Sequence, residues 1–437
     1  MKLPHHKKGT IYMLNSLPVF DNIDFKGGNL SSDGGSILLL QFLRKMYISD
    51  QFSKIPFNDN RFFPVYSNAN IMAQLTARTL LGYFNQADQN ILMEDPLLSK
   101  YFQACSQPTV SRFFDRVTNQ TNVVLREQLI EMACKYINQN VADPIIDADS
   151  TLLETYGNQE ASAYIHHYSE TGYHPLLINE FHSKLLLSAL LRTGSSYSSN
   201  GIVEELTTVL SYMYNRGTIR FRGDSAFYNT DLMQFLEDEE VTYYIRAKGF
   251  ETLSSEAMDD MIAHHIDWKE YTPFHPYYRE FQYSIANSKP RRILYKAYTV
   301  MQNGQITFFP VVYAVVTNDQ KCSPKEGMHF YELRGASENF TKELKNDFDG
   351  ARVSHKDFWK NEMDFLISAY AYNLFHLFQN RILRGTDKSI TMNTFRLLFQ
   401  KIAVKVIRHA GKLSLRFSTA YIRKRQFMHY WNLVLQI

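Results

Sequence analysis

The chain has 437 residues, 45% of them hydrophobic, and a formal net charge of +3. Its size indicates two or three folded domains, and its apolar content argues against an intrinsically disordered protein. Three scattered cysteines without a C-x-x-C pair exclude a cysteine zinc site of the usual spacing. No apolar run approaches the roughly 20 residues of a membrane span, and residues 1–10 are basic without a hydrophobic signal core. We therefore expect a cytoplasmic protein with reduced thiols and no membrane partner.

The N-terminal part is expected to form a loose leader over residues 1–28 and an all-α domain over 29–140, in which helical periodicity is broken near prolines. One segment of this domain, S-Q-P-T-V-S-R-F at 106–113, has the polar cap and early proline of a helix start. Its small hydroxyls and Arg112 suit a recognition helix in a major groove, although many helix starts share these features. Arg112 is therefore a candidate DNA contact.

A change of period at residue 143 predicts a core of strands and helices. Three strands, a helix, a strand, a helix and a strand follow each other, which is the order of a ribonuclease-H-like core. The expected segments are 145–149, 173–181, 184–192, 202–214, 218–224, 230–239 and 242–246. We assign the α/β core to residues 141–250 and, after an interruption, to 326–385.

Residues 251–325 interrupt this core, and alternating apolar and polar residues over 292–300 and 307–316 predict a mainly β insertion. Trp268 lies in an aromatic stretch of the insertion, where it either stacks on an unpaired base or belongs to a small hydrophobic core. Helices are expected to resume after the insertion and to continue to the C-terminus. The final region, 386–437, is basic with interleaved aromatics, which favours a polyanionic partner.

Acidic residues close two of the predicted strands. Asp149 ends the first strand, and Asp147 projects to the same face two residues earlier. Asp224 follows a later strand and precedes a helix, at the end of a strand where α/β sheets place their chemistry. Hard divalent cations need several converging oxygens. Asp149 and Asp224 are therefore candidate metal ligands with Asp147 in reserve, and acids at an ordinary surface strand end are the alternative.

Four polar residues share one stripe of a predicted helix: Tyr331, Arg334, Glu338 and Lys345. At about 100° per residue, their side chains lie within roughly 60° of each other. A carboxylate between two cations and a phenol suits a bound divalent metal and the phosphates around it. The alternative is an amphipathic helix with a mixed charged face.

The spacing Y-x2-R-x3-E-x6-K resembles the Y-R-E-K signature of a large group of bacterial insertion-sequence DDE transposases, from about residue 25 to the end of the chain. The string D-S-T at Asp149 resembles the first catalytic block of this group, and D-S-A-F at Asp224 resembles the second. The segment 106–113 also resembles its equivalent in these proteins. The three acids come in the order strand, strand and helix, with the insertion between the second and third.

This resemblance implies that Asp149, Asp224 and Glu338 bind two Mg²⁺ ions, which Mn²⁺ can replace, and catalyse DNA cleavage and strand transfer. It implies that the other three residues of the Y-R-E-K set, Tyr331, Arg334 and Lys345, contact DNA phosphate. The expected partners are double-stranded DNA, as terminal inverted repeats and as target, and a second copy of the chain in a dimer on DNA.

The expected function is cut-and-paste movement of an insertion sequence. A ribonuclease-H-like nuclease without strand transfer would keep the acids, and a catalytically decayed DNA-binding protein would keep the helix at 106–113 and the basic tail. The complete set of acids and Y-R-E-K residues weighs against decay. The insertion and the separate N-terminal domain weigh against a minimal nuclease.

Overall fold

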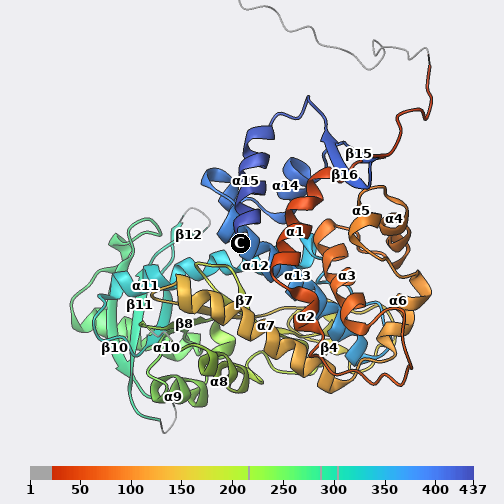
Figure 1. Cartoon of the computed structure of the whole chain (residues 1–437). Helices are drawn as coiled ribbons and strands as arrows, with labels where there is room; N and C mark the ends of the chain where they lie inside the picture. Colours follow the sequence, from red (N-terminus) through yellow and green to blue (C-terminus); the bar gives the residue numbers. More distant parts are fainter. Residues whose placement is uncertain (1–21, 215–216, 286–287, 303–304) are drawn as a thin grey trace, which may run out of the picture.

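The computed structural model describes residues 22–437 except 215–216, 286–287 and 303–304 (Figure 1). Most of the expected leader, residues 1–21, therefore lies outside the described residues. The N-terminal part that follows is helical, as predicted, apart from the short strand β1 (Leu30–Ser31). Its helices are α1 (Ile37–Lys45), α2 (Ile48–Phe52), α3 (Asn68–Leu81), α4 (Gln89–Glu94), α5 (Leu98–Tyr101), α6 (Gln107–Phe114) and α7 (Asn119–Asn140).

Helix α3 begins and ends at residues suited to those positions. The side chain of Ser67 accepts a hydrogen bond from the backbone N–H of Asn70 at the N-terminus. At the C-terminus, Gly82 takes a φ of 84°, a left-handed conformation that glycine adopts without steric cost. Most of the helix between them is buried.

A mixed sheet of eight strands crosses the middle of the chain, in the order β10-β11-β14-β9-β8-β2-β6-β7. The first five of its strands along the chain are β2 (Ile145–Ser150), β6 (Leu176–Glu180), β7 (Leu186–Leu190), β8 (Arg220–Gly223) and β9 (Thr242–Arg246). Strand β2 is antiparallel to β6 and parallel to β8, which is parallel to β9. These strands have the order and directions of a ribonuclease-H-like core, so the predicted fold class is confirmed.

Helices make the connections that parallel strands require. Helix α8 (Ile202–Tyr212) lies between β7 and β8 in the chain, and α9 (Thr230–Asp238) lies between β8 and β9. A further small sheet follows β2 in the chain and was not expected. It consists of β3 (Leu153–Glu154), β5 (Glu170–Tyr173) and β4 (Ala163–Ile165).

Helix α13 (Phe358–Ile382) is buried on all sides, because its apolar residues surround the whole helix. It packs against α3, α7 and β7, so the N-terminal helices and the sheet share one hydrophobic core. The division of the chain into domains stays a prediction. None of the described helices, α13 included, is both long and apolar enough to cross a membrane.

The β-rich segment joins the central sheet. Strands β10 (Tyr277–Tyr283), β11 (Arg291–Tyr298) and β14 (Val311–Thr317) pair antiparallel in series, and β14 pairs with β9. They form one side of the molecule, away from α4–α6 (Figure 1). The predicted strands are confirmed, but α10 (Phe250–Ala263) was not expected in this segment. Its buried Leu253, Ala257 and Met261 recur every fourth residue, which is a helical period.

The expectation of helices up to the C-terminus is wrong over residues 404–417. Strands β15 (Val404–His409) and β16 (Lys412–Phe417) form a hairpin, and β15 also pairs with β1. The connecting residues Ala410 and Gly411 both have positive φ, as in the two-residue turns that match the twist of a hairpin. Helices α14 (Met392–Phe395) and α15 (Lys424–Gln436) flank the hairpin.

Candidate active site

Asp149 and Asp224 lie side by side at one edge of the sheet. Strands β2 and β8 are parallel neighbours in which Ala148 is opposite Gly223, so the next residue of each chain is one of the two aspartates. The side chain of Asp149 is 18% exposed and that of Asp224 is 39% exposed. The sequence places an acid at the end of each strand, and the parallel register brings the acids together.

The guanidinium of Arg334 lies between these two carboxylates. Its Nη2 is 3.2 Å from Asp149 Oδ1 and 3.8 Å from Asp224 Oδ2, and it donates a hydrogen bond to the Ala148 carbonyl at 3.1 Å. Burial alone would lower the pKa of Arg334, but the charges of Asp149 and Asp224 raise it overall. Arg334 is therefore the counter-ion of the aspartate pair.

The ionisation of Asp149 reflects its neighbours. Burial raises the pKa of Asp149, the Arg334 charge opposes this rise, and the charges of Asp224 and Glu338 add to it. Glu338 is thus close enough to act electrostatically on Asp149. It is exposed in the first turn of α12 and forms no hydrogen bond or ion pair with another described residue.

The helix that carries the Y-R-E-K residues differs from the prediction of one regular stripe. This segment consists of three elements: helix α11 (Pro324–Glu332), a 3-10 turn (Leu333–Ala336) and helix α12 (Ser337–Asp347). Tyr331 belongs to α11, Arg334 to the 3-10 turn, and Glu338 with Lys345 to α12. A 3-10 turn advances further per residue than an α-helix, so the four side chains are not on one straight stripe.

Lys345 and Tyr331 contact the protein in different ways. Lys345 Nζ donates hydrogen bonds to Thr151 Oγ1 at 2.7 Å and to the Leu152 carbonyl at 2.6 Å, both just beyond Asp149. Burial lowers the pKa of Lys345. Tyr331 is half-buried, and burial raises the pKa of its hydroxyl. The two hydrogen bonds of Lys345 thus hold Thr151 and Leu152, the residues that follow β2, in place.

The reserve residue, Asp147, is buried with both oxygens bonded. Arg222 donates from Nε to Oδ1 at 2.7 Å and from Nη2 to Oδ2 at 2.8 Å, and Ser337 Oγ also donates to Oδ2. Neither side chain of the Asp147–Arg222 pair is more than 1% exposed. This carboxylate stabilises the sheet edge and has no open oxygen for a metal ion.

The structure keeps Arg112 and Trp268 apart from the acidic residues. Arg112 is exposed on α6, on the face opposite the buried Val110, Phe113 and Phe114. Trp268 is half-buried, packs against the main core and donates its indole N–H to the Phe308 carbonyl at 3.1 Å. These contacts favour the alternative that Trp268 belongs to a hydrophobic core.

Sequence reasoning missed several residues that hold this site. Arg222 and Ser337 bind Asp147, and Arg192 donates to Ser150 Oγ at 3.0 Å. Tyr168 donates its hydroxyl to the Ser150 carbonyl at 3.2 Å, and burial, with the charges of Asp149 and Asp224, raises its pKa. Arg222 directly follows the buried Phe221 in β8, and a buried arginine needs an acidic partner, but the strand also contains Arg220, so the sequence alone did not single out Arg222.

The donor chemistry of this edge suits a divalent cation. The carboxylate oxygens of Asp149 and Asp224 already face the guanidinium of Arg334. Hard divalent cations prefer oxygen ligands of this kind. In the described part of the chain, no three acidic, histidine or cysteine side chains lie close enough together to hold a metal ion. A shared site for Asp149, Asp224 and Glu338 therefore requires Arg334 and Glu338 to change position.

No curated protein matches this chain. Among solved structures it is similar to piggyBac transposase in a synaptic complex with hairpin DNA, with a TM-score of 0.45 and 11% identity over 84% of this chain and 80% of that chain. It is also similar to the Drosophila P element transposase in a strand transfer complex (TM-score 0.23, 10% identity, 47% of this chain and 43% of that chain). The Mos1 strand transfer complex has a TM-score of 0.17 and 12% identity over 54% of this chain and 84% of that chain.

A family model described as transposase DDE domain group 1 matches residues 21–436. The match covers nearly the whole described chain, including both strand-end aspartates and the helices with the Y-R-E-K residues. The chain belongs to this family of DDE transposases.

Proposed function

We propose that this protein is the transposase of an insertion sequence, which cuts DNA at the terminal inverted repeats of its element and joins the freed ends to target DNA. The observation that supports this most directly is the pair Asp149 and Asp224, which lie next to each other at the ends of two parallel strands. The guanidinium of Arg334 lies between their carboxylates. Family membership supplies the chemistry that such a pair performs.

DDE transposases as a family use divalent metal ions, and we propose two Mg²⁺ ions here, with Mn²⁺ able to replace them. Asp149 and Asp224 would hold them together with Glu338, which is exposed beside the pair and free of other partners among the described residues. Bound ions of this kind activate an attacking oxygen and stabilise the leaving oxygen of a phosphodiester.

The side chains around the acids have roles of their own. Arg334 neutralises Asp149 and Asp224 before a metal binds, and a bound cation would compete with it for the same oxygens. The released guanidinium could then form a bidentate contact with DNA phosphate. Lys345 fixes Thr151 and Leu152 and so orients Asp149, and with Tyr331 it would lie at the DNA backbone.

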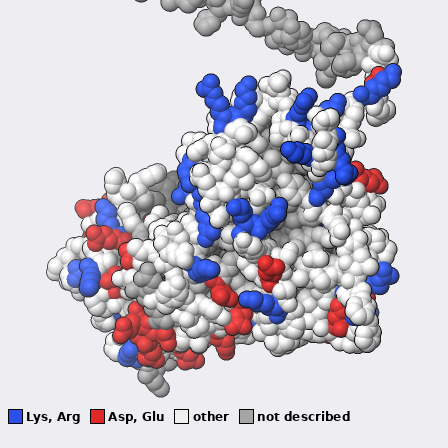
Figure 2. Space-filling model, viewed as in Figure 1, with Lys and Arg blue, Asp and Glu red and all other residues white. Residues whose placement is uncertain are grey.

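DNA binding is supported by charge on the surface. Exposed basic side chains gather on the β15–β16 hairpin and at the start of α15, on the end of the molecule that is rich in lysine and arginine in Figure 2. They are Lys405, Arg408, Lys412, Arg416, Lys424 and Arg425. Such a surface binds phosphate without sequence preference. Exposed Arg112 on α6 is the proposed base-reading contact, and two copies are expected to pair two DNA ends.

The test is Mg²⁺-dependent cleavage of a duplex that carries the end of the element. Asp149→Asn, Asp224→Asn and Glu338→Gln should each abolish cleavage while DNA binding persists. Asp231→Asn removes an exposed acid on α9 and is the matched control, which should cleave like wild type. Undiminished cleavage by Asp224→Asn would refute its assignment. Mass photometry with paired ends should show two protein copies per complex.

A further inference from the structure

The loops after β7 and β9 begin at the same edge of the sheet as the two aspartates. In the sheet order, β8, β2 and β6 lie between β9 and β7. The register sets Ser150, Leu176 and Leu190 side by side, so β7 ends at the edge where β2 ends. Ile245 of β9 is likewise opposite Gly223 of β8. The two loops therefore leave the sheet on either side of the proposed metal ligands.

One side-chain contact joins these two loops. Lys248, two residues after β9, donates a hydrogen bond from Nζ to the Tyr197 hydroxyl at 3.2 Å, and its Nζ lies 5.7 Å from the centre of the Tyr197 ring. Adjacent strands are roughly 4.8 Å apart, so β9 and β7 are roughly 19 Å apart in the sheet. The Lys248–Tyr197 pair thus connects the two sides of the edge that holds the aspartates.

The loop that carries Tyr197 is fixed beside the end of β2. The buried Arg192 donates from Nη1 to the carbonyls of Tyr197 at 3.1 Å and Ser198 at 2.9 Å. Its Nη2 donates to Ser150 Oγ at 3.0 Å, and Ser150 Oγ donates in turn to the Ser198 carbonyl at 3.0 Å. Ser150 directly follows Asp149 in the chain. The backbone of Tyr197 is therefore adjacent to a residue that bonds to the neighbour of Asp149.

The Lys248–Tyr197 pair is open to solvent and has free donors. Tyr197 is 51% exposed, and Lys248 is exposed as well. The Tyr197 hydroxyl accepts a hydrogen bond from Lys248 but donates none to a described residue, and neither side chain forms an ion pair with a described carboxylate. An ammonium and a phenol in contact present several N–H and O–H donors and one unpaired positive charge, which together suit an oxyanion.

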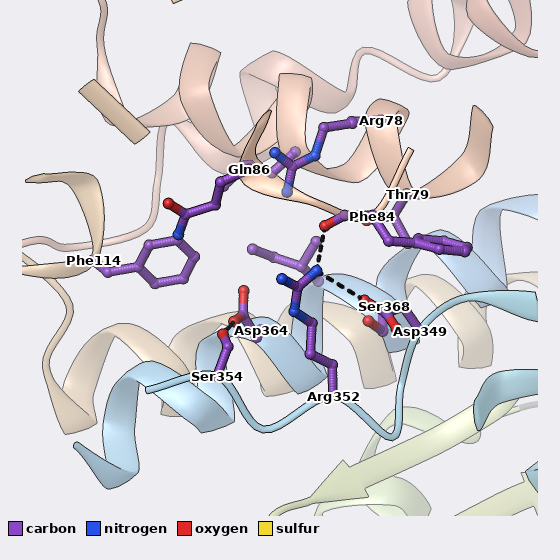
Figure 3. A pocket seen from close by; sticks show the side chains of 12 residues that line it. Arg78, Thr79, Phe84, Gln86, Phe114, Asp349, Arg352, Ser354, Asp364 and Ser368 are labelled. Carbon is purple, nitrogen blue, oxygen red and sulfur yellow. Dashed lines mark hydrogen bonds and ion pairs between the residues drawn. The ribbon is translucent and has the colours of Figure 1, made fainter. Parts of the chain in front are cut away.

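The enclosed cavity of Figure 3 does not offer such an unpaired charge. It lies between α3, α6 and α13 and is lined by Arg78 and Arg352 together with Asp349 and Asp364. The two carboxylates balance the two guanidinium groups, and the volume of about 30 Å³ is room for about two water molecules. Water is sufficient in that cavity, whereas the pair at the sheet edge has an open positive charge.

We propose that Lys248 and Tyr197 together bind one backbone phosphate of the cleaved DNA strand, beside the scissile phosphate at Asp149 and Asp224. The ammonium and the phenol each donate to an oxygen of this phosphate, which replaces the neutral phenol as the partner of the ammonium because a charged acceptor binds it more strongly. Contacts of this kind position a strand without reading its sequence. The inference rests on the proposed function, since that function brings the strand to the two aspartates.

The experiment measures the binding of duplexes that carry the element end to wild type, Lys248→Met and Tyr197→Phe. The matched controls are Lys135→Met on α7 and Tyr164→Phe on β4, because both side chains are exposed and form no hydrogen bond or ion pair with a described residue. The slope of log affinity against log salt should fall by about 0.9 in Lys248→Met, the value for one phosphate contact. Tyr197→Phe should weaken binding about tenfold with an unchanged slope, because a phenol carries no charge. Both controls should bind like wild type.

Duplexes with one neutral phosphate locate the contact. A methylphosphonate at one position next to the scissile bond should weaken binding by wild type and by Lys135→Met about tenfold, and should cost Lys248→Met nothing further. Equal losses for wild type and Lys248→Met at every position flanking the scissile bond would overturn the site. A salt slope of Lys248→Met equal to that of Lys135→Met would overturn it as well.

Cleavage is measured separately, so the contact and the proposed function fail in different ways. If wild type binds the element end but does not cleave it with Mg²⁺, the proposed catalysis is wrong and the binding results still decide the contact. If wild type cleaves while Lys248→Met and Tyr197→Phe bind like their controls, only the contact is wrong. Failure of wild type to bind the element end would overturn both.

Discussion

Ser337 donates a hydrogen bond to Asp147 and thereby joins the first residue of α12 to strand β2. Asp147 is two residues from Asp149, and Ser337 directly precedes Glu338. Arg222 extends the connection, because it binds both oxygens of Asp147 and donates from Nη1 to the Phe330 carbonyl of α11 at 2.9 Å. One buried carboxylate thus sets the distance between the strand and the helix that carry the proposed metal ligands.

Asp147→Ala should destabilise the protein strongly. The change leaves Arg222 as a buried cation without its partner, which costs about 3–5 kcal/mol in comparable pairs. Ser337→Ala keeps the ion pair and removes one hydrogen bond to a charged group, so a loss of about 1.5–3 kcal/mol is expected. Guanidinium unfolding measures both. Asp231→Ala, at an exposed position of α9, should change the free energy of unfolding by less than about 0.5 kcal/mol. A mild effect of Asp147→Ala would show that the pair is not a structural anchor.

Arg334→Gln should separate metal binding from catalysis. In wild type the guanidinium lies between Asp149 and Asp224, so an incoming cation must displace it. Without it, Mn²⁺ should bind at least about tenfold more tightly, equivalent to about 1.4 kcal/mol, by calorimetry without DNA. Cleavage should nevertheless fall, because the proposed phosphate contact is lost. Asp224→Asn is the opposite control and should weaken Mn²⁺ binding. Weaker binding by Arg334→Gln would mean that Arg334 supports the metal site and does not compete with the ion.

The sequence was sufficient for the parts of this site that depend on local periodicity and on chain order. The sequence located β2 and β8 with an acid at the end of each, and the family resemblance assigned Asp149 and Asp224 to one site. The helical stripe was only partly predictable. Periodicity does not distinguish an α-helix from the 3-10 turn at Leu333–Ala336, and that turn determines where Arg334 lies.

Other features arise from contacts between distant parts of the chain. Asp147 is 75 residues from Arg222 and 190 from Ser337, so no local pattern indicates that they bond. The strand signal of the β15–β16 hairpin was present in the sequence, because the exposed Lys405 lies between the buried Val404 and Val406 in the alternation typical of a strand. Its turn at Ala410 and Gly411 lacks the Asn or Asp that usually marks such a hairpin.

Lys345→Met distinguishes an anchor from a DNA contact. Loss of the bonds to Thr151 and Leu152 should lower the free energy of unfolding by about 1.5–3 kcal/mol and slow cleavage, since Asp149 precedes this segment. Lys342→Met removes an exposed lysine of the same helix and should leave stability unchanged. The salt dependence of DNA affinity is the second measurement. Unchanged stability with a salt slope reduced by about 0.9 would instead assign Lys345 to a DNA phosphate, in agreement with the sequence resemblance.

Glu362→Gln should alter how stability depends on pH. Glu362 is 2% exposed on α13 and contacts Asn122 Nδ2 at 2.9 Å and Arg126 Nη1 at 3.2 Å, and burial raises its pKa from 4.5 to about 7. Between pH 4.5 and 7 the folded protein keeps a proton on Glu362 that the unfolded chain has lost. The contribution of Glu362 to the free energy of unfolding is therefore complete below pH 4.5 and is lost as the pH rises toward 7 and above.

The variant carries no such proton and should match wild type near pH 4.5. At pH 8 it should be more stable than wild type by up to about 3 kcal/mol, the equivalent of the pKa difference. Arg126 keeps its other acidic partner, Glu205, at 3.3 Å, so the substitution leaves no cation unpaired. Denaturation at intervals from pH 4.5 to 8 measures the difference between the two proteins, with Glu256→Gln on α10 as a control for the loss of an exposed charge. A difference that stays constant over this range would show that Glu362 is ionised in the folded protein throughout, held by Arg126.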